Sequence, residues 1–215
     1  MNKTLTRMIE KMVAEFEEDS LLKNLLEKHN KAKEDLILCH NDFYHLNIIR
    51  NPDDRYFLID YEYSCINPYG WDIANILTEN TLCFNEDDFC FDVKVEHFPS
   101  YDDIFEMLKV FTIHYKSQVK LGDDPEFIKK MRSGEFDCLV NAMDLSKKTS
   151  NIFELCYILN AKWLLWIVLK IGELDCEWPM QDYVQKKWVL HKWFKKILNT
   201  PGLNSLMAIN SLYTV

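Results

Sequence analysis

The sequence has few glycines and little positive charge. Only 5 glycines are scattered over 215 residues, whereas average usage is about 7%. This excludes collagen-like and linker-rich architectures, and no glycine-rich loop can be built. Lys and Arg total 25 against 34 Asp and Glu, which gives a net charge of -9. Partners that require a basic patch, such as nucleic acid or an anionic membrane, are therefore not expected.

The sequence also lacks the cysteine and hydropathy patterns of secreted or membrane proteins. Its 7 cysteines form no C-x-x-C pair, which predicts reduced thiols in a cytoplasmic protein. The N-terminus has no apolar core typical of a signal peptide. The most apolar stretch, 152–171, carries Glu154, Asn160, Lys162 and Lys170. Because such side chains are costly in lipid, we expect a buried helix and no membrane insertion.

Apolar residues make up 48% of the sequence, which is enough for one core, and most of them recur at helical spacing. Apolar residues at 3–4 spacing predict one amphipathic helix over 4–29. Short apolar runs at 36–39, 47–50 and 56–59, with a turn at 51–54, predict a small β hairpin. Helices are then predicted at 71–81, 101–119, 125–132, 135–147, 151–171 and 180–198. The expected fold is mostly α with one small hairpin, as a single domain over 1–215.

Three oxygen-bearing side chains flank the predicted strands. Asp42 follows the first strand, Asn47 begins the second, and Asp60 ends the third. Because a hairpin brings strand ends together, we expect these side chains to converge. Two carboxylates and an amide oxygen suit Mg²⁺, which is bound by few protein ligands and bridges phosphates. Phosphoryl transfer uses the same groups, with one Asp for the acceptor hydroxyl and an Asn and Asp for the metal.

The run over residues 38–79 resembles the choline/ethanolamine kinase family. The motif HND is followed by four residues and Asn47, then by LIDYEYS (58–64), NPYGWDIAN (67–75) and Glu79. The resemblance implies the C-terminal lobe of a protein-kinase-like α+β fold, with the catalytic loop and metal site in 38–64. It implies that Asp42 is the catalytic base or orients the hydroxyl. Asn47 and Asp60 would bind Mg²⁺ and, through it, ATP.

The same resemblance implies supporting roles for neighbouring residues. His40 would brace the catalytic loop. Asp72 would tie that loop to the helix that follows. Glu62 stays open between a role in the metal site and exposure to solvent.

An aromatic pair marks a candidate acceptor pocket on the predicted helices 151–198. Trp163 and Trp166 lie three residues apart and project from one helix face. Aromatic faces attract ammonium groups, although by itself such a pair is more typical of a helix core. The resemblance implies an ammonium pocket made of Trp163, Trp166, Tyr63, Glu79 and Tyr183. Phe84 stands where the family has a tyrosine, so it keeps the ring and loses the hydroxyl.

The implied reaction is phosphate transfer from ATP to the hydroxyl of choline or ethanolamine, in phospholipid headgroup synthesis. The sequence does not choose between these two acceptors. An aminoglycoside or another hydroxyl compound is an alternative acceptor on the same scaffold. A homodimer is possible by analogy with the family.

The resemblance covers about 30–198, and the family's N-terminal nucleotide lobe has no counterpart here. That lobe normally supplies a phosphate-covering loop and a strand-borne Lys. Because half of the ATP site would be absent, we expect this chain alone to transfer phosphate poorly. The alternative is a non-catalytic or truncated lobe that binds a cationic ligand or a partner kinase chain.

Overall fold

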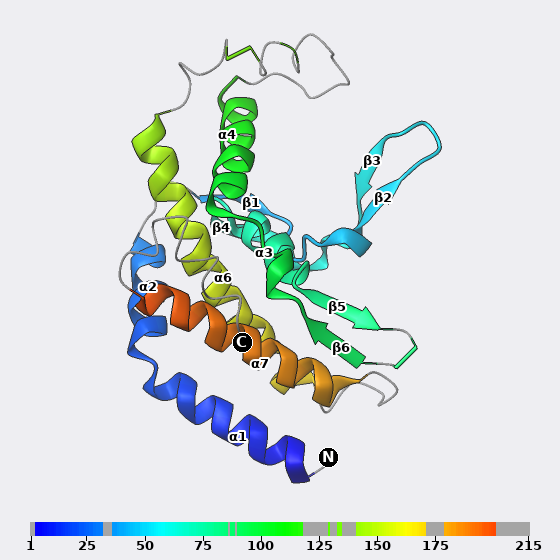
Figure 1. Ribbon diagram of the computed structural model, residues 1–215, viewed down its shortest axis with the longest axis vertical. Coiled ribbons are helices and arrows are strands. Elements are labelled where there is room, and N and C mark those ends of the chain that lie inside the picture. The colour runs from blue at the N-terminus through cyan, green and yellow to red at the C-terminus, as the bar shows by residue number, and fades with distance from the viewer. Residues whose placement is uncertain are drawn as a thin grey trace. The chain divides into compact units, whose positions relative to one another are not determined.

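The computed structural model describes residues 3–31, 36–85, 87–88, 90–117, 129, 133–134, 141–170 and 179–200 (Figure 1). The helices are α1 (Lys3–Glu18), α2 (Ser20–Lys31), α3 (Trp71–Glu79), α4 (Tyr101–Ser117), α6 (Ala142–Lys170) and α7 (Met180–Asn199). The strands are β1 (Leu36–Cys39), β2 (Ile48–Arg50), β3 (Tyr56–Leu58), β4 (Cys65–Pro68), β5 (Leu82–Asn85) and β6 (Cys90–Val93). The mostly helical fold with small sheets is confirmed.

The chain divides into two compact units. The first comprises Met1–Phe98 and Phe153–Pro201, and it contains every candidate site residue. The second comprises Pro99–Ile152 and Gly202–Val215. Within the second unit, the Tyr101 hydroxyl of α4 donates to the Ser146 carbonyl of α6 at 3.2 Å.

Asp19 separates the first two helices, so the prediction of one helix over 4–29 is wrong. The Asp19 carboxylate accepts the Leu22 N–H at 3.0 Å, which is the hydrogen bond of a helix N-cap. The same carboxylate accepts from the Tyr157 hydroxyl, and from Lys195 Nζ at 2.6 Å. A residue that belongs to no apolar stripe therefore ends α1, begins α2 and holds both against α6 and α7.

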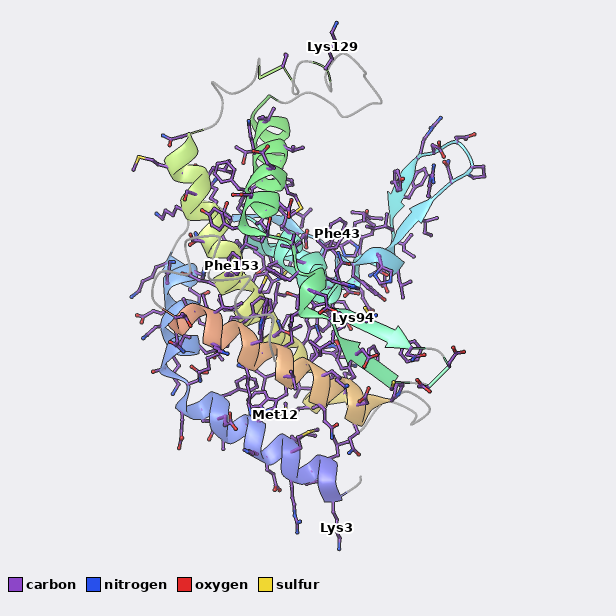
Figure 2. All side chains as sticks on the ribbon, in the orientation of Figure 1. Lys3, Met12, Phe43, Lys94, Lys129 and Phe153 are labelled. Carbon is purple, nitrogen blue, oxygen red and sulfur yellow. The ribbon has the colours of Figure 1, made fainter. Side chains whose placement is uncertain are left out.

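The buried face of α1 packs on α7, beside which it runs in Figure 1. Met12, labelled in Figure 2, is 1% exposed. The Phe16 ring makes edge contacts with Trp188 and His191 of α7, at centroid distances of 5.4 and 5.1 Å. The apolar 3–4 spacing of this segment thus serves helix-on-helix packing, as its pattern predicts.

The strands form three separate two-stranded antiparallel sheets. The predicted hairpin is β2–β3, in which Ile48 pairs with Leu58 and Arg50 with Tyr56, and it extends away from the helices (Figure 1). β1 pairs instead with β4, in the register Cys39↔Cys65. One hairpin therefore does not deliver all three oxygen-bearing side chains, and this prediction is wrong. Asp42 follows one sheet, whereas Asn47 and Asp60 flank another.

Three strands lie where the sequence predicts none. β4 and the β5–β6 hairpin fall after residue 60, in the part expected to be nearly all helical. β4 has the sequence CINP, and β5–β6 encloses an acidic turn. Strands of four residues are too short to display a period, and their pairing partners are set by tertiary contacts.

The later helices agree with the predicted segments where the structure describes them. The predictions at 71–81, 101–119, 151–171 and 180–198 correspond to α3, α4, α6 and α7. The helices predicted separately at 135–147 and 151–171 are one helix, because α6 runs without a break through 148–150, so the predicted break is wrong. Residues 135–140 and, apart from residue 129, the predicted helix 125–132 lie outside the described residues. Among the described helices, only the segment Met143–Lys170 has the length and hydropathy to cross a membrane. Its most apolar window is 67% buried within the protein, as in the core helix of a soluble protein.

Candidate active site

The loop between β1 and β2 is held by the first turn of α3. The backbone N–H groups of His40 and Asn41 donate to the two carboxylate oxygens of Asp72, each at 2.8 Å. Asp72 lies in the first turn of α3, where a carboxylate is favoured by the helix dipole. Asn41 has a φ of 67°, a left-handed conformation that Asn tolerates better than most residues. This sharp turn immediately precedes Asp42 and sets the direction of the chain at that residue.

Asp42 and Asn47 are in direct contact. The Asn47 amide Nδ2 donates to Asp42 Oδ2 at 2.9 Å and to the Asp42 carbonyl at 2.9 Å. Burial raises the pKa of the Asp42 carboxyl; the Asn47 hydrogen bond opposes this, and the charge of Glu79 adds to it. The result is a fixed carboxylate that is more basic than an exposed one. Since Nδ2 makes both bonds, the Asn47 oxygen is the atom that suits a metal.

The end of the β2–β3 hairpin lies beside this pair. The Ile59 N–H donates to the Asn47 carbonyl at 3.1 Å. The His40 ring, 5% exposed, donates from Nε2 to the Ile59 carbonyl at 2.8 Å. Asp60 follows with a φ of 65°. His40 therefore joins the loop between β1 and β2 to the strand that leads to Asp60.

The oxygen donors at the end of β3 fit magnesium better than a metal that takes all of its ligands from the protein. Within the described ranges, no three His, Cys, Asp or Glu side chains form a metal-binding group. Mg²⁺ is commonly bound by one or two carboxylates together with water and phosphate oxygens. The Asp60 carboxylate and the Asn47 amide oxygen are of that type. Glu62 lines a cavity beside these residues, so both of its predicted roles stay open.

A cavity of about 1170 Å³ joins the loop to the helices. Its lining contains all but three of the predicted site residues: Asp42, Asp60, Tyr63, Glu79, Trp163, Trp166 and Tyr183. The predicted residues that do not line it are His40, Asn47 and Asp72, whose hydrogen bonds hold the loop. Tyr44, which the sequence did not single out, also lines the cavity. Burial, followed by the charges of Asp42 and Glu79, raises its pKa.

Three aromatic rings form one wall of this cavity. The centroids of Trp163 and Trp166 are 5.6 Å apart at an interplanar angle of 79°. The Tyr63 centroid lies 6.1 Å from Trp163 and 6.4 Å from Trp166, at 80° and 83°. Edge-to-face rings of this kind present π faces in several directions toward one space. We refer to these three rings as the aromatic box.

The aromatic box is connected to the loop between β1 and β2 through the buried side-chain amide of Asn75. Trp163 Nε1 donates to Asn75 Oδ1 at 2.9 Å, and Asn75 Nδ2 donates to the Phe43 carbonyl at 3.1 Å. Asn75 is 0% exposed, and Phe43, labelled in Figure 2, is the residue after Asp42. Sequence reasoning missed Asn75, although it belongs to the run NPYGWDIAN; its position on a buried helix face was the only available signal.

Lys162 touches both the box and the loop, and sequence reasoning missed its role. Its Nζ donates to the Asn41 carbonyl at 3.1 Å. The same Nζ lies 4.0 Å from the Trp163 ring centroid and 5.8 Å from that of Tyr63. Burial lowers the pKa of Lys162, and the charge of Asp42 acts in the opposite direction.

Glu79 is paired to a second lysine. Lys187 Nζ donates to Glu79 Oε1 at 2.5 Å, and the Lys187 side chain is 0% exposed against 15% for Glu79. The same ammonium is 5.7 Å from the Tyr183 ring centroid. Burial, and then the charge of Glu79, raises the pKa of Tyr183 well above its usual value. The carboxylate expected to receive a ligand cation therefore already has an internal partner.

The β5–β6 hairpin completes the wall opposite the loop, and Figure 1 shows it beside the start of α7. The Phe91 N–H donates to the Asp182 carboxylate of α7. The Phe91 ring lies 5.0 Å from Phe84 and 5.1 Å from Tyr183. Phe84 therefore lines the cavity on a strand that the sequence did not predict.

The family model for choline/ethanolamine kinases matches residues 2–192. The chain belongs to the choline/ethanolamine kinase family. Within this family, it is 40% identical over 68 residues to a probable choline kinase 2 of Arabidopsis thaliana, a match that covers 31% of the chain and 18% of the relative. It is 25% identical over 158 residues to a human choline/ethanolamine kinase, covering 71% of the chain and 36% of the relative.

A solved choline kinase of Cryptosporidium parvum has the same fold, with a TM-score of 0.60 and 21% sequence identity. The likeness covers 100% of the present chain and 55% of that kinase. The chain thus spans about a third of the human choline/ethanolamine kinase and about half of the solved choline kinase.

Proposed function

We propose that this choline/ethanolamine kinase chain carries the acceptor site and metal-binding residues of an ATP-dependent phosphotransferase for a small amino alcohol. The observation that carries the proposal is the position of Asp42, held by Asn47 at 2.9 Å, at a cavity whose wall is the aromatic box. A hydroxyl attached to an ammonium group can meet both features at once. Free thiols at the five cysteines of the described residues support a cytoplasmic location.

In the proposed reaction, the acceptor oxygen bonds to the γ-phosphorus of ATP while the bond to the β–γ bridging oxygen breaks. Asp42 takes the hydroxyl proton, and ADP leaves. The raised pKa of Asp42 favours this role, because a general base works best when its pKa approaches the operating pH. Asn47 and Asp60 would hold Mg²⁺, which neutralises charge on the transferring phosphate when bound.

The acceptor nitrogen would lie between the rings of the box and the acidic groups of the cavity. Cation–π contacts are worth about 0.5–2 kcal/mol each. Asp42 and Glu79 supply negative charge on the other sides. A rigid box and a rigid loop, joined through Asn75, would set the separation between ammonium and hydroxyl.

A second observation supports a partner lobe for this chain. Leu36, Leu38 and Ile66 of the β1–β4 sheet are 46%, 72% and 59% exposed. Neighbouring apolar side chains at this exposure are typical of an interaction surface. We propose that a nucleotide-binding lobe, from the same protein or another chain, packs there and supplies the rest of the ATP site. Homodimer formation stays a prediction.

The test is Asp42→Ala in this chain joined to a competent nucleotide lobe, with ADP release measured for choline and ethanolamine. The proposal predicts a fall in turnover of about 100- to 10,000-fold with little change in melting temperature. Asp53→Ala, in the exposed turn of β2–β3, serves as the matched control and keeps full turnover. Near wild-type turnover of the Asp42 variant would refute the role of this residue. The 215-residue chain without that lobe is expected to turn over poorly.

A further inference from the structure

The rings and carboxylates of the acceptor cavity are already contacted by the protein's own ammonium groups. Lys162 Nζ lies within 6 Å of two of the three box rings, at 4.0 Å from Trp163 and 5.8 Å from Tyr63. Both distances are in the range of cation–π attraction. Lys187 Nζ is bound to Glu79. The cavity therefore does not offer a ligand the full electrostatic attraction of its rings and acids.

Lys162 is held in this position by the catalytic loop. Its Nζ donates to the Asn41 carbonyl at 3.1 Å, and the charge of Asp42 acts on it directly. Lys162 is not among the residues that line the cavity, and its ammonium lies between the Asn41 carbonyl and the Trp163 ring. A ligand cation bound at the same rings is repelled by this resident positive charge.

The consequence differs for the two kinds of ammonium. A quaternary ammonium has no N–H group, so ring faces and net charge are the main attractions available to it. A primary ammonium has three donors, and the cavity lining offers it the oxygen-bearing side chains of Glu79 and Tyr44. A resident cation on the rings weakens the first kind of attraction and leaves these acceptors in place.

We propose that Lys162 is a specificity-determining residue that makes this pocket select a primary ammonium alcohol over a quaternary one. The inference rests on the proposed function, because it names the acceptor class of that same site. Choline and ethanolamine are suitable probes, since they differ only in three methyl groups on nitrogen.

The experiment measures the binding of both probes by isothermal titration calorimetry to the full 215-residue chain and its variants. Wild type is expected to bind ethanolamine more tightly than choline. Lys162→Met keeps the unbranched stem and removes the charge, and it is expected to tighten choline binding about 3- to 30-fold. Ethanolamine is expected to gain less than half of that factor, because hydrogen bonds hold it.

Two variants serve as controls. Lys162→Arg keeps a cation beside the rings and is expected to keep the wild-type preference. Lys192→Met removes a lysine that lies 4.9 Å from the Trp188 ring, an indole that does not line the cavity. It is a lysine-on-indole pair of the same kind at another place, and its loss is expected to change neither affinity.

The outcomes separate this inference from the proposed function. If wild type binds choline more tightly than ethanolamine, or if Lys162→Met leaves choline affinity unchanged or weaker, the selectivity role of Lys162 is wrong and the cationic pocket stands. If neither probe binds to wild type or to Lys162→Met, both the selectivity role and the ammonium pocket are wrong. Circular dichroism and thermal melting of each variant establish that the compared proteins are folded.

Discussion

The Glu79–Lys187 ion pair makes a sharp prediction, because its two partners differ in burial. Lys187 is 0% exposed, whereas Glu79 is 15% exposed at the cavity wall. Glu79→Gln leaves a buried ammonium without a counter-charge, and breaking a buried pair in this way costs about 3–5 kcal/mol. For a chain of this size, the melting temperature should fall by roughly 6–20 °C.

The reverse change should cost less. In Lys187→Met, the Glu79 carboxylate is left at a cavity that water can enter, so the penalty is that of a partly solvated group, about 1–3 kcal/mol. In the double variant Glu79→Met, Lys187→Met, no charge is left unpaired, and stability should return to within about 1 kcal/mol of wild type. The expected order of melting temperatures is therefore wild type and double variant highest, then Lys187→Met, then Glu79→Gln.

An exposed pair of equal length provides the matched control. Lys31 and Glu27 are also 2.5 Å apart, but their side chains are 74% and 63% exposed. Surface pairs contribute less than about 1 kcal/mol, so Glu27→Gln should melt close to wild type. Thermal unfolding followed by circular dichroism measures all five proteins. A Glu79→Gln variant that melts within 2 °C of wild type would refute the reasoning from burial.

Three further predictions concern pH and the support of the site. Burial lowers the pKa of His191 to about 4 from a usual 6.5, so the stability that the neutral His191 ring gives the fold is full above pH 6.5 and is lost as the pH falls toward 4. The free energy of urea unfolding of His191→Phe should therefore depend less on pH between about 4 and 6.5 than that of wild type, and an unchanged pH dependence would contradict this. Asp72→Ala should speed hydrogen exchange at the two loop amides that it accepts, and unchanged protection would contradict its bracing role. Asn75→Leu leaves Trp163 Nε1 and the Phe43 carbonyl without their buried hydrogen-bond partner. The free energy of unfolding should therefore fall by about 2–6 kcal/mol, and a fall below about 1 kcal/mol would show that water replaces both hydrogen bonds.

The sequence by itself determined the local chemistry of the loop. The family pattern over 38–79 was sufficient to predict the choline/ethanolamine kinase family and the kinase-like fold. The order of Asp42, Asn47 and Asp60 along the chain led to the prediction of a phosphotransfer site. Helices with long apolar periods, such as α6 and α7, were also predictable, because burial of one face imposes a period that the sequence displays.

The tertiary structure decided which elements meet and which charges are buried. The sequence of a four-residue strand does not specify which strand it pairs with, so only the tertiary structure showed that β1 pairs with β4. Lysines on helices are ordinarily solvated, and no pattern in the sequence predicts that Lys162 is half-buried or that Lys187 is buried. Lys162 contacts the Asn41 carbonyl and Lys187 contacts Glu79 because the loop, α3, α6 and α7 pack around one cavity, which brings together groups more than 100 residues apart. Electrostatics inside a fold depends on such non-local neighbours, which the linear sequence does not specify.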